Sequence, residues 1–184
     1  QENQQLNENL TNLQQENADL SSKASQYESE LNRLENSRMA LEDQLKGTGA
    51  TVRIKNGAVS VLLPGAILFD AGQTALRPQS KTTLKKIAGI IKTETAGEIV
   101  RIEGHTDNDP ISRQKDKYKS NWELSAARAA AVLHYMVEEC GVSPTKVYIA
   151  GFGQYQAMAD NKSKTGKAKN RRVEFVIMPR GSGG

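Results

Sequence analysis

Residues 98–129 read EIVRIEGHTDNDPISRQKDKYKSNWELSAARA, and this stretch decides the fold. Its first residues, 98–104, carry buried-type aliphatic residues among polar ones, which predicts a strand. The polar, proline-containing segment 105–119 predicts an exposed loop. Ser120 and Glu123 then have the S-x-x-E spacing of a capping box, so a helix is expected to begin there. A strand, a loop and a helix in this order predict a sheet covered by helices.

The segments on either side continue this mixture of strands and helices. Asn56-Gly57 separates two β-prone runs and is a strong hairpin signal, because both turn positions need positive φ. We therefore expect an α+β fold, a two-layer α/β sandwich in which a mixed sheet carries helices on one face. The other predicted elements are strands 51–55, 58–63, 146–150 and 172–178, a short apolar piece 67–69, helices 78–92 and 120–141, and a lysine-rich loop 160–170.

A long N-terminal helix is predicted before the sandwich. Residues 1–46 contain no proline or glycine, and their apolar positions follow a spacing of four and three. Leucine at d with an isolated asparagine, Asn17, at a favours a parallel coiled coil of two copies. The alternative is a single amphipathic helix, about 69 Å long, that folds back on the globular domain. The seam comprises Leu6, Leu13, Leu20, Tyr27, Leu34 and Leu41 at d, and Asn3, Leu10, Asn17, Ala24, Leu31, Arg38 and Leu45 at a.

The chain thus divides into four parts. We expect a coiled-coil helix over 1–46, a linker and the start of the hairpin over 47–58, and the globular domain over 59–180. Residues 181–184, Gly-Ser-Gly-Gly, resemble a cloning remnant. The chain begins at Gln1 with no methionine, signal peptide or apolar span, so we expect an excised segment of a longer protein.

Charge differs sharply between the helix and the domain. Residues 1–46 hold 4 Lys/Arg and 9 Asp/Glu, a net charge of −5, whereas residues 47–184 hold 21 and 12, a net charge of +9. A basic domain favours anionic surroundings such as cell-wall polymer, acidic lipid or nucleic acid. Nucleic acid is disfavoured, because aromatic and basic residues do not interleave on a recognisable strand platform.

Several motifs carry a family resemblance. Three segments occur in this order: Gly104-His-Thr-Asp107, Asn121-Trp-Glu-Leu-Ser-Ala-Ala-Arg-Ala129 and Asn170-Arg-Arg-Val173. The pair Phe69-Asp70 precedes all three, and Ala150-Gly-Phe-Gly153 lies between the second and the third. Together they resemble the OmpA C-terminal-like family, which includes the peptidoglycan-associated lipoproteins and the flagellar stator protein MotB. The resemblance covers about residues 59–178 and implies a non-catalytic sandwich that binds peptidoglycan. The sequence of residues 121–125, Asn-Trp-Glu-Leu-Ser, is similar to that of MotB-type members.

The resemblance also implies a receptor for a zwitterion. A diaminopimelate side chain ends in an ammonium and a carboxylate, so its receptor needs an anion beside a planar cation. By resemblance, Asp107 receives the ammonium and Arg128 makes a forked contact with the carboxylate. The other residues implied in peptidoglycan binding are Thr106 and Asn121 at the rim, Arg171 nearby, and the Phe69-Asp70 pair.

Each of these residues also has a purely structural interpretation. Asp107 and Arg128 could form a salt bridge with no ligand, and Asn121 could serve the helix terminus. The loop 108–120 is longer than in the lipoprotein-type members and could narrow or cover the pocket. Two further pairs have such alternatives: Arg171 and Arg172 could pin the last strand, and Phe69 and Trp122 could be core or pocket wall.

No catalytic residue, metal or cofactor is expected. His105 with Asp107 suggests a metal pair, but His134 lies far along the next helix, and no nucleophile stands near an oriented base. We expect a non-enzymatic anchor in the periplasm or at the outer membrane of a bacterium, attached to a membrane through an upstream segment. The alternatives are a flagellar stator anchor and a coiled-coil interaction module whose sandwich no longer binds the wall.

Overall fold

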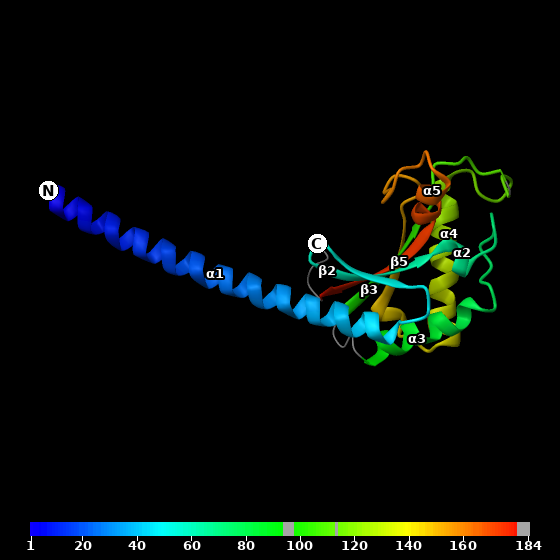
Figure 1. Cartoon of the computed structure of the whole chain (residues 1–184), viewed down its shortest axis with the longest axis horizontal. Helices are drawn as coiled ribbons and strands as arrows, with labels where there is room; N and C mark the ends of the chain where they lie inside the picture. The colour runs from blue at the N-terminus through cyan, green and yellow to red at the C-terminus, as the bar shows by residue number, and fades with distance from the viewer. Residues whose placement is uncertain (94–97, 113, 180–184) are drawn as a thin grey trace.

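The computed structural model describes residues 1–93, 98–112 and 114–179, and it shows a sheet-and-helix domain with one long helix projecting from it (Figure 1). The predicted α/β sandwich is confirmed. The helices are α1 (Glu2–Gln44), α2 (Gly65–Leu68), α3 (Ser80–Thr93), α4 (Asn121–His134) and α5 (Lys164–Asn170), and α4 runs on into a π-helical turn, Tyr135–Glu139. The strands are β1 (Thr51–Lys55), β2 (Ala58–Pro64), β3 (Glu98–His105), β4 (Val147–Gly151) and β5 (Arg172–Pro179).

The sheet is mixed, with the strand order β1-β2-β5-β3-β4. β3 and β4 pair in parallel, while β1 with β2, β2 with β5 and β5 with β3 are antiparallel. The hairpin predicted from Asn56-Gly57 joins β1 and β2, and both residues have positive φ, 52° and 71°. The last strand therefore lies in the middle of the sheet, where β2 and β3 flank it.

Side chains alternate between two buried faces of the sheet. Val173 and Phe175 of β5 point into an apolar core that also contains Ile87 of α3 and Val132 of α4. Arg172 and Glu174, at the intervening positions, are buried on the opposite face. The helices thus cover one face, and the other face holds charged side chains.

A close approach between α4 and β3 positions the N-terminal half of α4. Gly104 has no side chain, and a Cβ atom at this position would lie 2.0 Å from the backbone oxygen of Ser125. Only glycine permits this separation. The contact holds the start of α4 against the end of β3, so side chains from both elements can reach a common site.

α1 is divided between two environments. Its last part packs on the sandwich, where Leu34, Leu41 and the following Leu45 are buried. An ion pair of 3.6 Å joins Arg33 to Glu98 at the start of β3. Upstream, the helix extends away from the domain (Figure 1), and the seam positions there are exposed. Only the end of α1 thus packs on the domain, and the rest of the helix does not fold back. The coiled coil predicted over 1–46 stays a prediction, with Leu34, Leu41 and Leu45 of its seam buried on the sandwich instead.

One predicted loop contains a helix. We expected an irregular loop over 160–170, but α5 forms at its end, where Ser163 Oγ accepts a hydrogen bond from Gly166 N at 3.0 Å. The side chain of Asn170 is fully buried and accepts hydrogen bonds from Met158 N and Ala159 N, each at 2.9 Å. These non-local bonds order the segment, and its lysine-rich composition gave no sign of them.

Two other predictions concern the C-terminal tail and membrane-spanning segments. The tail 181–184 lies outside the described residues. Among the helices in the described part of the chain, none combines the length and the apolar character needed to cross a lipid bilayer.

Candidate functional site

A cavity of about 290 Å³ opens beside the C-terminal end of β3. Asp107, from the segment after β3, and Arg128, from α4, both line it. The two groups that were predicted to hold a zwitterion therefore share one cavity. The other lining residues are Ala71, Gly72, Thr106, Asp109, Pro110, Ile111, Ser112, Asn121, Leu124 and Arg171.

Arg128 is a buried cation with no acidic partner among the described residues. Only 7% of it is exposed. Its Nε donates to the carbonyl of Gln73 at 3.1 Å, and its guanidinium lies 5.3 Å from the centre of the Phe69 ring. Burial lowers the pKa of Arg128, and the charge of Arg171 adds to this effect, while Asp107 opposes it. A buried charge without a direct counter-ion is costly, so an anion that entered the cavity would be bound favourably.

Asp107 is held by the chain around it. Its Oδ2 accepts a hydrogen bond from Arg171 Nη1, and its Oδ1 accepts one from Asp109 N at 3.2 Å. A direct salt bridge between Asp107 and Arg128 is not among the ion pairs of the described residues. The cavity therefore presents an anion that is paired on one side and a cation that is not paired, which suits a ligand carrying both charges.

Asn121 and Thr106 complete the rim. Asn121 is the first residue of α4 rather than its cap, because Ser120 occupies the cap position and its N–H donates to Glu123 Oε2 at 2.6 Å. The Asn121 amide donates to the carbonyl of Asp109 at 3.0 Å and thereby ties the long loop to α4. Thr106 Oγ1 is buried and has no hydrogen-bond partner within the described residues, which leaves one polar atom of the lining unsatisfied.

The Phe69-Asp70 pair is divided by the structure. Phe69 is buried and its ring lies against the guanidinium of Arg128, so it supports a lining residue without itself lining the cavity. Asp70 does not belong to the lining, and its carboxylate accepts from Arg77 Nε at 2.8 Å at the surface. The structure brings Asp107, Arg128, Thr106, Asn121 and Arg171 together, with Asp70 outside this group.

The long loop 108–120 forms a wall of the cavity. Pro110, Ile111 and Ser112 line it. Gln114 donates to Gln73 Oε1 at 2.7 Å, so the loop is bridged to the segment after Phe69. The loop therefore bounds the cavity on one side and does not fill it.

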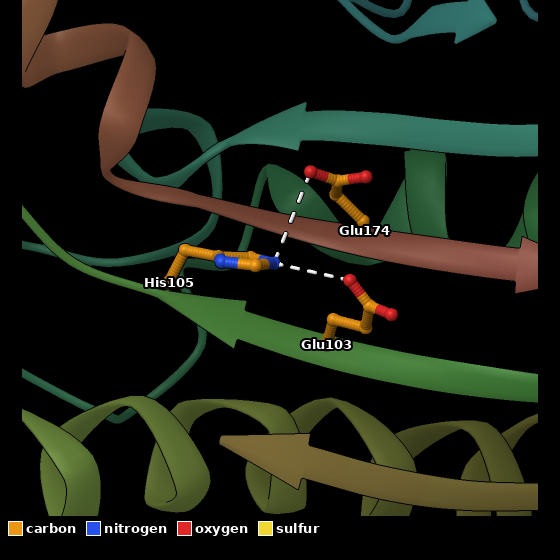
Figure 2. Close-up of side chains that lie close together, drawn as sticks. All are labelled: Glu103, His105 and Glu174. Atoms are coloured by element: carbon orange, nitrogen blue, oxygen red, sulfur yellow. Dashed lines mark hydrogen bonds and ion pairs between the residues drawn. The ribbon is translucent and has the colours of Figure 1, made fainter. Parts of the chain in front are cut away.

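A charged cluster is buried on the opposite face of the sheet (Figure 2). His105 Nε2 lies 3.2 Å from Glu103 Oε2 and 3.8 Å from Glu174 Oε1. Arg53 and Arg172 contact the same Glu174 carboxylate at 2.6 Å and 2.5 Å. Burial alone would raise the pKa of Glu174, but these two guanidinium groups outweigh it and lower the pKa to about 2.

This cluster has the residue types of a metal site but the charge balance of an ion network. The ligand atoms of Glu103, His105 and Glu174 lie within 4.8 Å of one another. A dication there would face the guanidinium groups already bound to both carboxylates, since Arg101 contacts Glu103 at 2.6 Å. Burial lowers the pKa of His105, which favours its neutral form. The cluster therefore fits a structural role, in which it fixes the start of β5 and the adjacent Arg171.

The sequence contained only part of this information. Both Arg171 and Arg172 could have pinned the last strand, and only Arg171 was also expected near the pocket. In the structure Arg171 lines the cavity, and Arg172 belongs to the buried charged network. The alternation of charged and apolar residues along 172–175 was the available signal for that network. The lining residues Ala71 and Gly72 could not be predicted from the sequence, because small residues are common in loops with or without a binding site.

Comparison with known proteins identifies the family. The OmpA family model matches residues 68–171, which is more than half of the chain. The chain belongs to the OmpA family. It is a domain of the non-catalytic, peptidoglycan-binding kind.

Similar proteins are components of the bacterial envelope. Motility protein B of Bacillus subtilis is 32% identical over 142 residues, which cover 77% of this chain and 50% of that protein. The periplasmic domain of Helicobacter pylori MotB has a TM-score of 0.66 at 27% identity, covering 73% of this chain and 82% of that one. The cell wall anchor of the T6SS from Pseudomonas aeruginosa also has a TM-score of 0.66, at 29% identity, covering 76% and 94%. The chain spans about half the length of the first two curated relatives it matches.

Proposed function

We propose that this domain binds the diaminopimelate-containing peptide stem of peptidoglycan and thereby anchors an envelope protein to the cell wall. The observation that carries the proposal is Arg128, a buried guanidinium without an acidic partner in the described residues, which lines the same cavity as Asp107. The family and the periplasmic setting of the Helicobacter relative support it.

The roles of the charged groups follow from their present partners. The ligand carboxylate would bind Arg128, because two nitrogens of that guanidinium are not used by Gln73. The ligand ammonium would bind Asp107, whose carboxylate can accept from it and from Arg171 together. Each charge-assisted contact contributes about 1.5 to 3 kcal/mol.

Retention on purified sacculi tests this proposal. We expect Asp107→Ala and Arg128→Ala each to weaken retention roughly 10- to 100-fold, the loss of one charge-assisted contact. Asp70→Ala is the matched control, because Asp70 is another acidic residue of the family motifs but lies outside the cavity lining. Equal retention of the native domain and both cavity variants would refute the proposal and favour the interaction module.

A pair of soluble peptides tests the zwitterion itself. A stem tripeptide with lysine in place of diaminopimelate keeps the ammonium and lacks the side-chain carboxylate. We expect calorimetry to show tighter binding of the diaminopimelate peptide, and Arg128→Ala to remove the difference. Arg128→Lys should restore little of it, because an ammonium cannot make the forked contact.

We further infer that the projecting part of α1 pairs with a second copy in parallel. The leucines at positions 6, 10, 13, 20 and 31 are exposed, as is Tyr27. Sedimentation at micromolar concentration, with and without residues 1–31, tests this inference. A monomer in both cases contradicts it.

The likeness to Motility protein B supports a stator anchor as the more specific candidate. Such an anchor would be attached to a membrane through a segment upstream of the domain. Full-length protein tests the assignment: a stator predicts that loss of the protein stops swimming, whereas a general wall anchor predicts normal motility and altered envelope integrity.

A further inference from the structure

Two exposed aromatic rings stand beside the cavity. Trp122, in the first turn of α4, is 47% exposed, and Tyr155, in the turn after β4, is 64% exposed. Their ring centres are 4.9 Å apart, and their planes differ by 23°. Large exposed rings often mark binding surfaces, because water solvates their faces poorly.

Hydrogen bonds of the surrounding backbone and side chains hold this aromatic pair in place. Gly153 N donates to Ser125 Oγ at 2.9 Å, and Tyr155 N donates to the carbonyl of Phe152 at 3.2 Å. The amide of Asn121, next to Trp122, donates to Gln154 Oε1 at 2.9 Å. The turn that carries Tyr155 is thus fixed to the helix that carries Trp122, so the two rings form a preorganised surface.

The rings form one side of a groove of about 400 Å³. Its lining also includes the donors and acceptors of Lys115, Lys119 and Gln154. A volume of this size lies within the roughly 300 to 1,000 Å³ range of small-ligand sites. An aromatic surface beside polar side chains suits a ligand that has an apolar face and a polar edge.

The groove adjoins the cavity of Asp107 and Arg128. Pro110, Ile111 and Asn121 line both spaces. One extended ligand can therefore occupy the cavity with one end and the groove with the other.

We propose that the groove binds a sugar ring of the glycan strand from which the peptide stem branches. A pyranose has a face of polarised C–H groups, which the negative face of an aromatic ring attracts, and a rim of hydroxyl and amide groups for Gln154 and the lysines. The sugar is covalently joined to the stem, so it must lie near the bound diaminopimelate. This inference rests on the proposed function, and it adds a second ligand class to the same site.

Calorimetry with two ligands tests the inference: a disaccharide carrying the diaminopimelate tripeptide, and the same tripeptide alone. We expect the native domain to bind the disaccharide-peptide roughly 3- to 10-fold more tightly, the contribution of a stacked ring. Trp122→Ala and Tyr155→Ala should each reduce this advantage and leave the affinity for the free tripeptide unchanged. Trp122→Phe should retain part of it, and circular dichroism should show that each variant is folded.

Tyr148→Ala is the matched control, because Tyr148 is a 42% exposed aromatic residue on β4 that lines neither space. It should keep the full advantage of the disaccharide-peptide. Equal affinity of the native domain for both ligands would overturn the inference, as would an advantage that survives in both alanine variants. Failure of the native domain to bind the free tripeptide would instead contradict the proposed stem site, so the two failures can be told apart.

Discussion

Replacement of Glu174 by glutamine should remove a defined part of the acid sensitivity of the domain. Glu174 is fully buried and its carboxylate contacts Arg53 and Arg172. The two guanidinium groups lower its pKa from 4.5 to about 2 in the folded chain, despite the opposing effect of burial. A folded-state pKa that is lower than the unfolded value stabilises the protein above the unfolded pKa, and this stability is lost as the pH falls toward the folded pKa.

The size of the effect follows from these two pKa values. A decrease from 4.5 to about 2 corresponds to about 3 kcal/mol of unfolding free energy. The native domain should therefore lose about 3 kcal/mol through this one carboxyl between pH 5 and pH 2. Glu174→Gln cannot lose it, because glutamine does not titrate. Its stability at neutral pH should already be lower by roughly 3 to 5 kcal/mol, since Arg53 and Arg172 lose their shared partner.

Urea denaturation followed by circular dichroism, at a series of pH values from 7 to 2.5, measures both quantities. Other acidic groups are common to the native and variant proteins, so the difference between their two curves isolates Glu174. Glu16→Gln, an exposed carboxylate on the projecting part of α1, is the control and should follow the native curve. If Glu174→Gln showed the same decline from pH 5 to pH 2.5 as the native domain, the buried network would not hold this carboxylate ionised, and our account of it would be wrong.

Three further predictions concern packing and binding. Gly104→Ala should destabilise the domain by more than about 2 kcal/mol, because the new Cβ would lie 2.0 Å from the Ser125 backbone oxygen. Gly89→Ala is the contrasting variant: Gly89 lies in α3 with open space around it, so this change should raise the melting temperature. Leu41→Ala should lower the unfolding free energy by about 2 to 5 kcal/mol, as measured by denaturation, because Leu41 is buried. Leu13 is exposed, so Leu13→Ala should leave the unfolding free energy of the monomer unchanged and weaken only self-association, as measured by sedimentation. Peptide affinity should fall as salt rises from 0.05 to 0.5 M and should fall less for Arg128→Ala; identical salt dependence in the two proteins would argue against a charge contact at this residue.

The fold was predictable from local signals that agree with one another. The turn at Asn56-Gly57, the capping box at Ser120 and the alternation on β5 each point to an element that the structure contains. The helix α5 was missed, because its order depends on Asn170, whose bonding partners lie 9 to 12 residues away. Sequence spacing does not register contacts of that kind.

The candidate site was predictable to a smaller extent. The motif around Asp107 and Arg128 gave the two charges, and the structure shows that they share a cavity. It could not give the pairing of Asp107 with Arg171, because that contact joins residues 64 positions apart. The environment of the end of α1 was also not predictable from the sequence, because one continuous heptad pattern has its upstream leucines exposed to solvent and its last leucines buried on the sandwich.

The helix and the cavity lie at opposite ends of the same two strands. α1 meets the sandwich near Glu98 and Ile177, the beginning of β3 and the end of β5, whereas the cavity adjoins Thr106 and Arg171 at their other ends. The projecting part of α1 therefore leaves the sandwich at the end away from the cavity. A partner bound along that part of the helix would not obstruct the cavity, so both could be occupied at the same time.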